Sequence, residues 1–213
     1  MQREIILPER EPPLEWILGK AVPKVGYEFP HATIQGELSS LLDVWAEGRG
    51  SVAISWTFRL GPPGEDIRPQ VPDVAYLSYE SMAKAKAEGK ITSTRDLDVP
   101  LIPPNLAVEV LSPQDRKELI AEKTRVFLAA GTDLVLLADP DEQMIETHDG
   151  VGVKTYRSGQ TFAHPKLPGF ELNITALFET LDFPDWLGLP KDIPKSIKKK
   201  ADNPTTRESR RRR

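Results

Sequence analysis

Two charged residues stand in segments that are otherwise apolar, and both are of types that hydrolases use. Glu109 lies in the middle of NLAVEVLS at 105–112, a nearly continuous apolar run typical of a covered strand. An ionised carboxylate there is costly unless it meets a cation or good hydrogen-bond donors. We therefore interpret Glu109 as functional or paired, the alternatives being a structural ion pair and an edge position that faces water.

The second charged residue is Lys123, in a segment at 114–130 whose apolar residues recur with a helical period. It falls inside that stripe, four residues after Leu119 and four before Phe127. We expect its ammonium to point toward the sheet and to pair with Glu109. Such a pair can be purely structural or part of an active site, and a lysine stem can also reach around to water.

A second carboxylate, Asp73, follows Pro72 at the start of VPDVAYLS at 71–78. A Pro-Asp pair alone is a common turn. If this strand neighbours the one that carries Glu109, the two acids offer hard oxygen ligands to Mg²⁺ or Mn²⁺. We then expect both carboxylates and the Lys123 nitrogen to converge within roughly 3–6 Å on a surface-connected pocket.

Two weaker candidates belong to an amphipathic segment at 31–48. Glu37 flanks its apolar stripe and could add a metal ligand, although a glutamate at such a boundary is more often solvated. His31 opens the segment and could contact a substrate phosphate, or be a plain helix-end histidine. We interpret His148 and His164 as structural, since they lack metal-ligand spacing.

The elements that must position these residues form a mixed pattern of helices and strands, which indicates an α/β domain with a mixed central sheet and a helix on each face. The predicted strands lie at 51–60, 71–78, 105–112 and 133–140, with a short strand or hairpin at 16–25 and a turn-rich loop at 61–70. The predicted helices lie at 31–48, 78–90 and 114–130, and an antiparallel β end with a short closing helix lies at 142–181.

Composition excludes several classes of protein. The 213 residues fit one domain and contain no cysteine, which excludes disulfides, thiolate metal clusters and a cysteine nucleophile. No apolar run is long enough for a membrane span, and the first residues lack the apolar core of a secretory signal. A cytoplasmic protein with no membrane partner is the expectation.

Charge is unevenly distributed along the chain. The net charge is −4, but the residues from Lys191 onward hold ten Lys and Arg against three acids, a balance of +7 that leaves −11 for the rest. The basic tail could hold phosphates by counterion release. Its alternative interpretation is a disordered, solvated terminus.

From Trp16 to Leu181 the chain resembles the Uma-two restriction-endonuclease family, a branch of the PD-(D/E)XK nuclease superfamily. The resemblance is carried by HATIQGELSSLL, by VPDVAYLS, by LPGFELNITALF and above all by NLAVEVLSPQDRKELIAEKTRVFLAAGTDLVLLADPDE. It implies a restriction-endonuclease-like core with an antiparallel β extension. The resemblance therefore divides the chain into a flexible segment at 1–15, an endonuclease-like domain at 16–182 and a basic, disordered tail at 183–213.

The resemblance also implies a site and an activity. Asp73, Glu109 and the backbone carbonyl of Val110 would hold Mg²⁺ or Mn²⁺, and Lys123 would be the catalytic lysine of a phosphodiester hydrolase acting on nucleic acid, with DNA favoured. The superfamily places its lysine two residues after the acid, where this chain has Leu111, whereas the family supplies it from the following helix. Phe127 stands where the family often has tyrosine.

Two other hypotheses stay open. The chain could be a catalytically silent module that keeps the nuclease fold and binds nucleic acid or a protein partner, or that acts through a homodimer. It could also be an unrelated α/β protein in which Glu109 and Lys123 form only a core salt bridge, and replacing both by apolar residues would then be neutral or stabilising.

Overall fold

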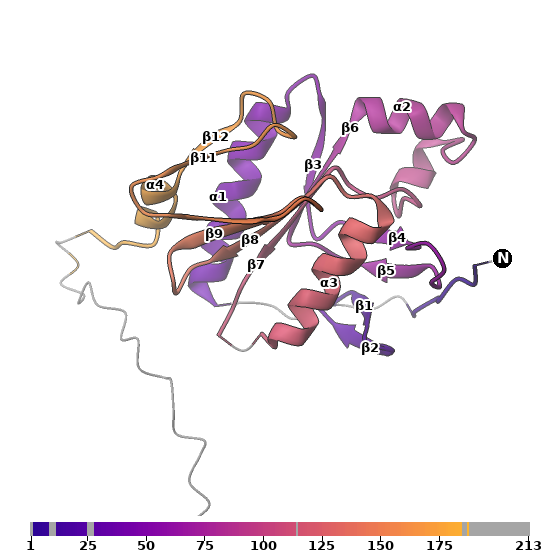
Figure 1. Ribbon diagram of the computed structural model, residues 1–213, viewed down its shortest axis with the longest axis horizontal. Helices are drawn as coiled ribbons and strands as arrows, with labels where there is room; N and C mark the ends of the chain where they lie inside the picture. Colours follow the sequence, from indigo (N-terminus) through magenta and orange to yellow (C-terminus); the bar gives the residue numbers. More distant parts are fainter. Residues whose placement is uncertain (1, 9–11, 25–27, 114, 185–186, 188–213) are drawn as a thin grey trace, which may run out of the picture. The chain divides into compact units, whose positions relative to one another are not determined.

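The computed structural model describes residues 2–8, 12–24, 28–113, 115–184 and 187 (Figure 1). The chain divides into two units, Met1–Leu181 and Asp182–Arg213. All the helices and strands named below belong to the first unit. Nearly all of the basic tail predicted at 183–213 lies outside the described residues.

The centre of the first unit is a six-stranded mixed sheet with the strand order β10-β9-β8-β7-β6-β3. Its strands are β3 (Gly50–Ile54), β6 (Val74–Ser78), β7 (Leu106–Val110), β8 (Leu134–Asp139), β9 (Met144–His148) and β10 (Val153–Arg157). Only the β7–β8 pair is parallel. The predicted mixed sheet is therefore confirmed, and β7 lies inside it with every residue buried.

Helices cover both faces of this sheet (Figure 1). The helix α1 (Phe29–Ala46) packs on one face together with α4 (Ile174–Glu179), and α3 (Lys117–Ala130) packs on the other. A further helix, α2 (Tyr79–Ala87), follows β6, and a short 3-10 turn, η1, spans Thr94–Leu97. The predicted helix at 114–130 thus begins later, at Lys117, and ends as expected at Gly131, whose φ of 107° suits glycine.

The strand β7 sorts its side chains between the two faces as period-two alternation predicts. Leu106, Val108 and Val110 join the apolar core under α1. Ala107 joins the core under α3, and Glu109 shares that face by alternation. The strand therefore presents its one carboxylate to the helix that carries Lys123.

The first described segments pack against the domain rather than standing apart. The hairpin predicted at 16–25 consists of β1 (Leu14–Ile17) and β2 (Lys20–Pro23), so it begins before the boundary predicted at residue 16. The backbone of Ile67 also accepts a hydrogen bond from the Ile5 amide and donates one to the Arg3 carbonyl. The described part of 1–15 therefore contributes to the fold.

The prediction of a single strand at 51–60 is wrong. The chain leaves β3 at Ser55, whose φ of 51° is left-handed, and continues as β4 (Phe58–Leu60) in a separate two-stranded sheet with β5 (Arg68–Gln70). The Ser55 amide donates to the Asp73 carbonyl at 3.1 Å, which fixes this bend. The loop predicted at 61–70 consequently ends in a strand.

The antiparallel end predicted at 142–181 is present, although β9 and β10 extend the central sheet. It finishes with a hairpin of β11 (Thr161–Ala163) and β12 (Glu171–Asn173), followed by α4. In the part of the chain that the structure describes, no helix is both long and apolar enough to cross a bilayer.

Candidate functional site

The two acids predicted as metal ligands lie on neighbouring strands. In the antiparallel pair of β6 and β7, Val74 faces Val108 and Ala75 faces Ala107. Extending this register by one residue sets Asp73 opposite Glu109, and the Asp73 amide donates to the Val108 carbonyl at 2.9 Å. The sequence left open whether these two strands are neighbours, and the structure shows that they are.

Lys123 lies on the buried face of α3, between the sheet and the β1–β2 hairpin. Its Nζ is 2.8 Å from Oε1 of Glu109, and it donates to the Val71 carbonyl at 3.1 Å. Only 4% of its side chain is exposed. The predicted pairing of Lys123 with Glu109 is thus confirmed.

A third buried carboxylate, Glu15, was not singled out from the sequence. Its Oε1 lies 2.9 Å from Nζ of Lys123 and accepts a hydrogen bond from the Val71 amide at 2.7 Å. Alternation in LEWI sets Glu15 on the same side as Ile17, which is a weak signal of an inward position. Nothing in the sequence connects it to a lysine 108 residues away.

A second lysine, Lys24, lies directly after β2 and bridges the two predicted ligands. Its Nζ is 2.9 Å from Oδ1 of Asp73 and 3.1 Å from Oε2 of Glu109. Sequence reasoning missed this residue too, because a lysine after Pro23 carries no burial signal. We call the following five residues the carboxylate–lysine cluster: Glu15, Lys24, Asp73, Glu109 and Lys123.

The N-terminal turns of α1 and the end of β7 hold Asp73 in place. Nε2 of His31 lies 3.3 Å from Oδ2 of Asp73, the Val110 amide donates to the same oxygen at 2.8 Å, and the Gln35 side chain donates to the Asp73 carbonyl at 2.9 Å. Glu37, in contrast, is half-buried and makes no hydrogen bond or ion pair with the cluster among the described residues. His31 therefore lies at the site, and Glu37 as a metal ligand has no support from these contacts.

The remaining histidines lie elsewhere, as expected. His148 contacts Glu146 at 2.7 Å, and His164 contacts Asp149 at 3.3 Å. Among the described residues, neither of them forms an ion pair with Asp73 or Glu109. The structure therefore gives them no part in the cluster.

The cluster is closed to solvent, which differs from the expected surface-connected pocket. Lys24 is its most exposed residue at 8%. Burial favours the neutral form of a carboxyl group and would raise the pKa of Asp73, but the charge of Lys24, the hydrogen bond with His31 and the charge of Lys123 together hold that pKa well below its ordinary value. Asp73 is therefore ionised whenever the protein is folded near neutral pH.

Glu109 is shifted in the opposite direction. Burial raises its pKa more than Lys123 and Lys24 lower it, and the negative charges of Asp73 and Glu15 add to the rise. Two adjacent carboxyl groups thus differ in their affinity for protons, because burial and two neighbouring carboxylates outweigh the lysines at Glu109, whereas Lys24, His31 and Lys123 outweigh burial at Asp73. Perturbed and unequal carboxyl groups of this kind are a feature of functional sites.

The arrangement suits one shared divalent cation better than a closed ligand cage. Among the described residues, no three His, Asp or Glu side chains are grouped as metal ligands. However, Asp73 and Glu109 both contact a single cationic atom, the Lys24 Nζ, so they face a common point. Since Mg²⁺ is often held by only one or two carboxylates with waters completing its shell, the residues present fit such an ion.

A family model named Uma2 and described as "Putative restriction endonuclease" matches residues 3–175. The chain belongs to the Uma2 family. The match covers most of the chain and includes Glu15 and Lys24. It begins at residue 3, earlier than the start at Trp16 that the sequence motifs indicate. It confirms the resemblance, and with it the coarse assignment to nucleases.

Solved structures support the same fold. This Uma2 member is similar to a crystal structure described as a putative nuclease belonging to DUF820 from Anabaena variabilis ATCC 29413, with a TM-score of 0.68 and 23% sequence identity. The match covers 82% of this chain and 94% of that one. No match was found among curated proteins.

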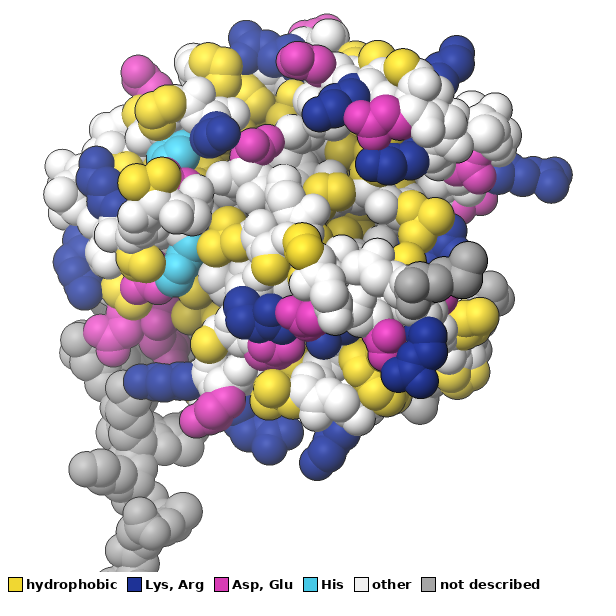
Figure 2. All heavy atoms as spheres, turned by 45° about the vertical axis from the view of Figure 1, so that its right-hand side comes forward, with side chains coloured by type: hydrophobic (Ala, Val, Ile, Leu, Met, Phe, Trp, Pro, Cys, Tyr) yellow, Lys and Arg dark blue, Asp and Glu magenta, His cyan; other side chains and the backbone are white. Residues whose placement is uncertain are grey.

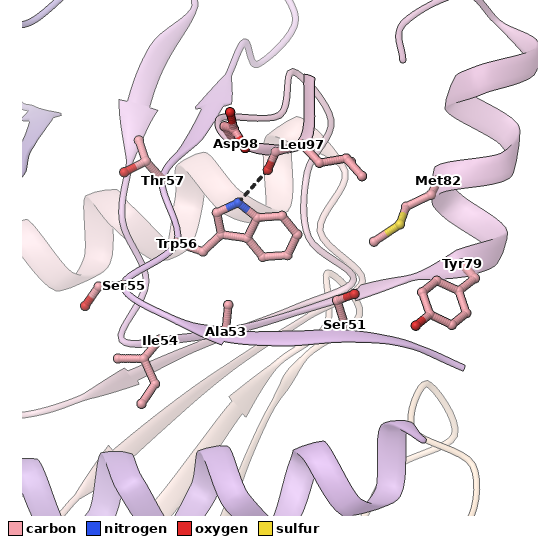
Figure 3. A pocket seen from close by; sticks show the side chains of 10 residues that line it. All are labelled: Ser51, Ala53, Ile54, Ser55, Trp56, Thr57, Tyr79, Met82, Leu97 and Asp98. Carbon is pink, nitrogen blue, oxygen red and sulfur yellow. Dashed lines mark hydrogen bonds between the residues drawn. The ribbon is translucent and has the colours of Figure 1, made fainter. Parts of the chain in front are cut away.

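An open hollow of about 630 Å³ lies outside the cluster, beside the edge strand β3 (Figure 3). Ala53, Trp56 and Met82 line it, and the Trp56 indole donates to the Leu97 carbonyl at 3.0 Å. Asp98 is the one charged side chain in its lining. Without a cation or a second acid in its lining, this hollow lacks the groups for phosphate chemistry.

Charges on the face shown in Figure 2 are mixed in sign. Basic and acidic side chains are interspersed there with exposed hydrophobic ones. That face therefore does not present the continuous basic track that non-specific binding to nucleic acid would favour.

Proposed function

We propose that this protein is a metal-dependent endonuclease that hydrolyses phosphodiester bonds in nucleic acid, with DNA as the favoured substrate. Membership of the Uma2 family supports a nuclease. The observation that carries the finer proposal is that Asp73 and Glu109 share one cation while a second buried lysine, Lys123, lies 2.8 Å from Glu109. Two acids and a lysine beside a common cation position are the groups that metal-assisted phosphate hydrolysis requires.

Asp73 and Glu109 would hold Mg²⁺ or Mn²⁺, with the Val110 carbonyl as a third ligand. The bound ion would polarise a phosphate oxygen and lower the pKa of a water molecule. The low pKa of Asp73 keeps this ligand ionised, and the Val110 amide and His31 fix its orientation. His31, expected from the sequence to face substrate, contacts Asp73 here, which favours a positioning role.

Lys123 supplies positive charge that offsets the negative charge gained by the phosphate in the transition state. Glu15 and the Val71 carbonyl hold its amine at 2.9 Å and 3.1 Å. Because both of these partners lie outside the pair of metal ligands, they keep Lys123 in place while Glu109 binds an ion. Glu15 is thus a positioning residue for Lys123.

The test is cleavage of supercoiled plasmid and of single-stranded DNA in Mg²⁺ or Mn²⁺, with EDTA as the metal-free control. We expect metal-dependent cleavage by the wild type, its loss in Asp73→Asn, and a decrease of about 10²–10⁴-fold in Lys123→Ala. Asp98→Asn is the matched control, since Asp98 is an exposed acid in the hollow at β3. Circular dichroism verifies that each variant is folded.

Cleavage that persists in EDTA, or that Asp73→Asn leaves unchanged, would contradict the proposal. A catalytically silent module that binds nucleic acid is the second candidate, and one observation favours it: lysines already neutralise the buried carboxylates. Retention of labelled DNA without cleavage under every metal condition would support that candidate instead.

A further inference from the structure

The ammonium group of Lys24 lies at the point that an ion shared by Asp73 and Glu109 has to occupy. Nζ is 2.9 Å from Oδ1 of Asp73 and 3.1 Å from Oε2 of Glu109, one oxygen from each carboxylate. The contact joins residues 85 positions apart in the chain, and all three side chains are buried. Lys24 is thus a buried member of the site and not a surface lysine near it.

An ammonium and a divalent ion cannot occupy this point together. Mg²⁺ binds oxygen at about 2.0–2.1 Å, so it would lie between the same two oxygens, and two cations so close in a buried site repel strongly. Oδ1 of Asp73 is fully buried and accepts no hydrogen bond of good geometry among the described residues, although it contacts the ammonium. That oxygen is therefore able to take a metal once the lysine has left.

The second lysine does not compete for the same point. Lys123 contacts the other oxygen of Glu109, Oε1, and is also held by Glu15 and by the Val71 carbonyl. An ion between Asp73 and Glu109 would therefore displace Lys24 and leave Lys123 where it is. The two lysines of the cluster consequently have different roles.

We propose that Lys24 is an internal competitor for the metal: its ammonium occupies the cation position in the metal-free protein and leaves when Mg²⁺ or Mn²⁺ binds. The inference rests on the proposed function for the identity of the metal ligands. While metal is absent, Lys24 compensates the buried charge of Asp73 and shares with Lys123 the compensation of Glu109. The same contact lowers the apparent affinity of the site for metal, because only the fraction of molecules in which Lys24 is displaced can bind the ion.

The first test measures Mn²⁺ binding to the full chain by isothermal titration calorimetry. Lys24→Met removes the competitor and is expected to bind Mn²⁺ about tenfold more tightly than the wild type, or more. Lys20→Met is the matched control, since Lys20 is an exposed lysine of the same hairpin, and its affinity should equal that of the wild type. Without metal Lys24→Met should melt at a lower temperature than the wild type, and Mn²⁺ should raise its melting temperature more.

The second test uses the wild-type protein, so that it decides the matter even if Lys24→Met does not fold. An amine-acylating reagent is applied in EDTA and in saturating Mn²⁺, and the modified lysines are identified by mass spectrometry. Lys24 should be protected in EDTA and modified in Mn²⁺. Lys20 should be modified in both conditions and Lys123 in neither.

Equal Mn²⁺ affinity of wild type and Lys24→Met, or protection of Lys24 while Mn²⁺ is bound, would overturn the role of Lys24. If metal-dependent cleavage persisted in that case, the proposed nuclease would stand without this competitor. Absence of Mn²⁺ binding to both proteins would overturn the competitor and the metal site together.

Discussion

The two faces of the central sheet are buried alike, yet they differ in the charge that they carry. Toward α1, the strand β7 presents Leu106, Val108 and Val110, all at most 2% exposed. Toward α3, the same strand presents Ala107 and the carboxylate of Glu109, which is only 3% exposed. The five residues of β7 thus separate an apolar core from a second apolar core that borders the carboxylate–lysine cluster.

A folded chain can hold charge in its interior where neighbouring elements supply groups of opposite charge. On the α3 face, the hairpin contributes Lys24 and the helix contributes Lys123, so that Glu109 meets two cations within about 3 Å. Next to Val108, the α1 helix contributes Ile34, Leu38 and Leu42, which can neither donate a hydrogen bond nor carry charge. Burial alone therefore does not decide which face carries the site, since the neighbouring elements do.

The largest effect should come from placing a carboxylate on the aliphatic face. Val108→Glu puts a charge next to Glu109 in sequence but on the side without cations, and we expect a loss of more than about 4 kcal/mol in the free energy of unfolding, or failure to fold. Urea denaturation followed by circular dichroism measures it. Val108→Thr, which is similar in shape but neutral, should lose only about 1–3 kcal/mol. Equal losses in the two variants would contradict the claim that this face cannot hold a charge.

Removing one cation from the charged face should have the next largest effect. Lys123→Met leaves Glu15 and Glu109 with less compensation, and we expect a loss of about 3–5 kcal/mol in urea denaturation. Lys117→Met is the matched control, because Lys117 is an exposed lysine of the same helix, and it should change stability little. Similar values for the two variants would mean that the Lys123 ion pairs contribute nothing.

Urea denaturation also tests the alternative that Glu109 and Lys123 form a purely structural ion pair. In Glu109→Leu combined with Lys123→Met, both charges of one pair are removed, so the loss should be smaller than the sum of the two single losses. A combined variant that is as stable as the wild type and still cleaves DNA would exclude these residues from catalysis.

The smallest effect concerns the acid limb of stability. The pKa of Asp73 is lowered in the folded protein from an ordinary value of 3.8, so its stabilising contribution is complete above that value and is lost as the pH falls below it. Between about pH 5 and pH 2, the wild type should therefore lose on the order of 1–2 kcal/mol more than Asp73→Asn. Thermal unfolding at a series of pH values measures this, and parallel curves would show that Asp73 is not stabilised by its cations.

Local patterns predicted much of the fold because they report burial along a single element. The apolar periods at 31–48 and 114–130 correspond to α1 and α3, and the apolar run at 105–112 corresponds to β7. The strand at 51–60 was mispredicted because its break is a left-handed Ser55, a conformation that a serine does not signal. A backbone carbonyl from another strand, that of Asp73, fixes the bend.

The candidate site divides in the same way. The apolar patterns of their own elements predicted that Glu109 and Lys123 face inward, because the period of each pattern sets the direction of the residue that interrupts it, and both side chains are buried. That Glu15 and Lys24 join them, across 108 and 85 residues of chain, became known from the packing of the folded chain. Charge compensation acts through space and not along the chain, so the partners of a buried carboxylate become known only when the elements that carry them have packed together.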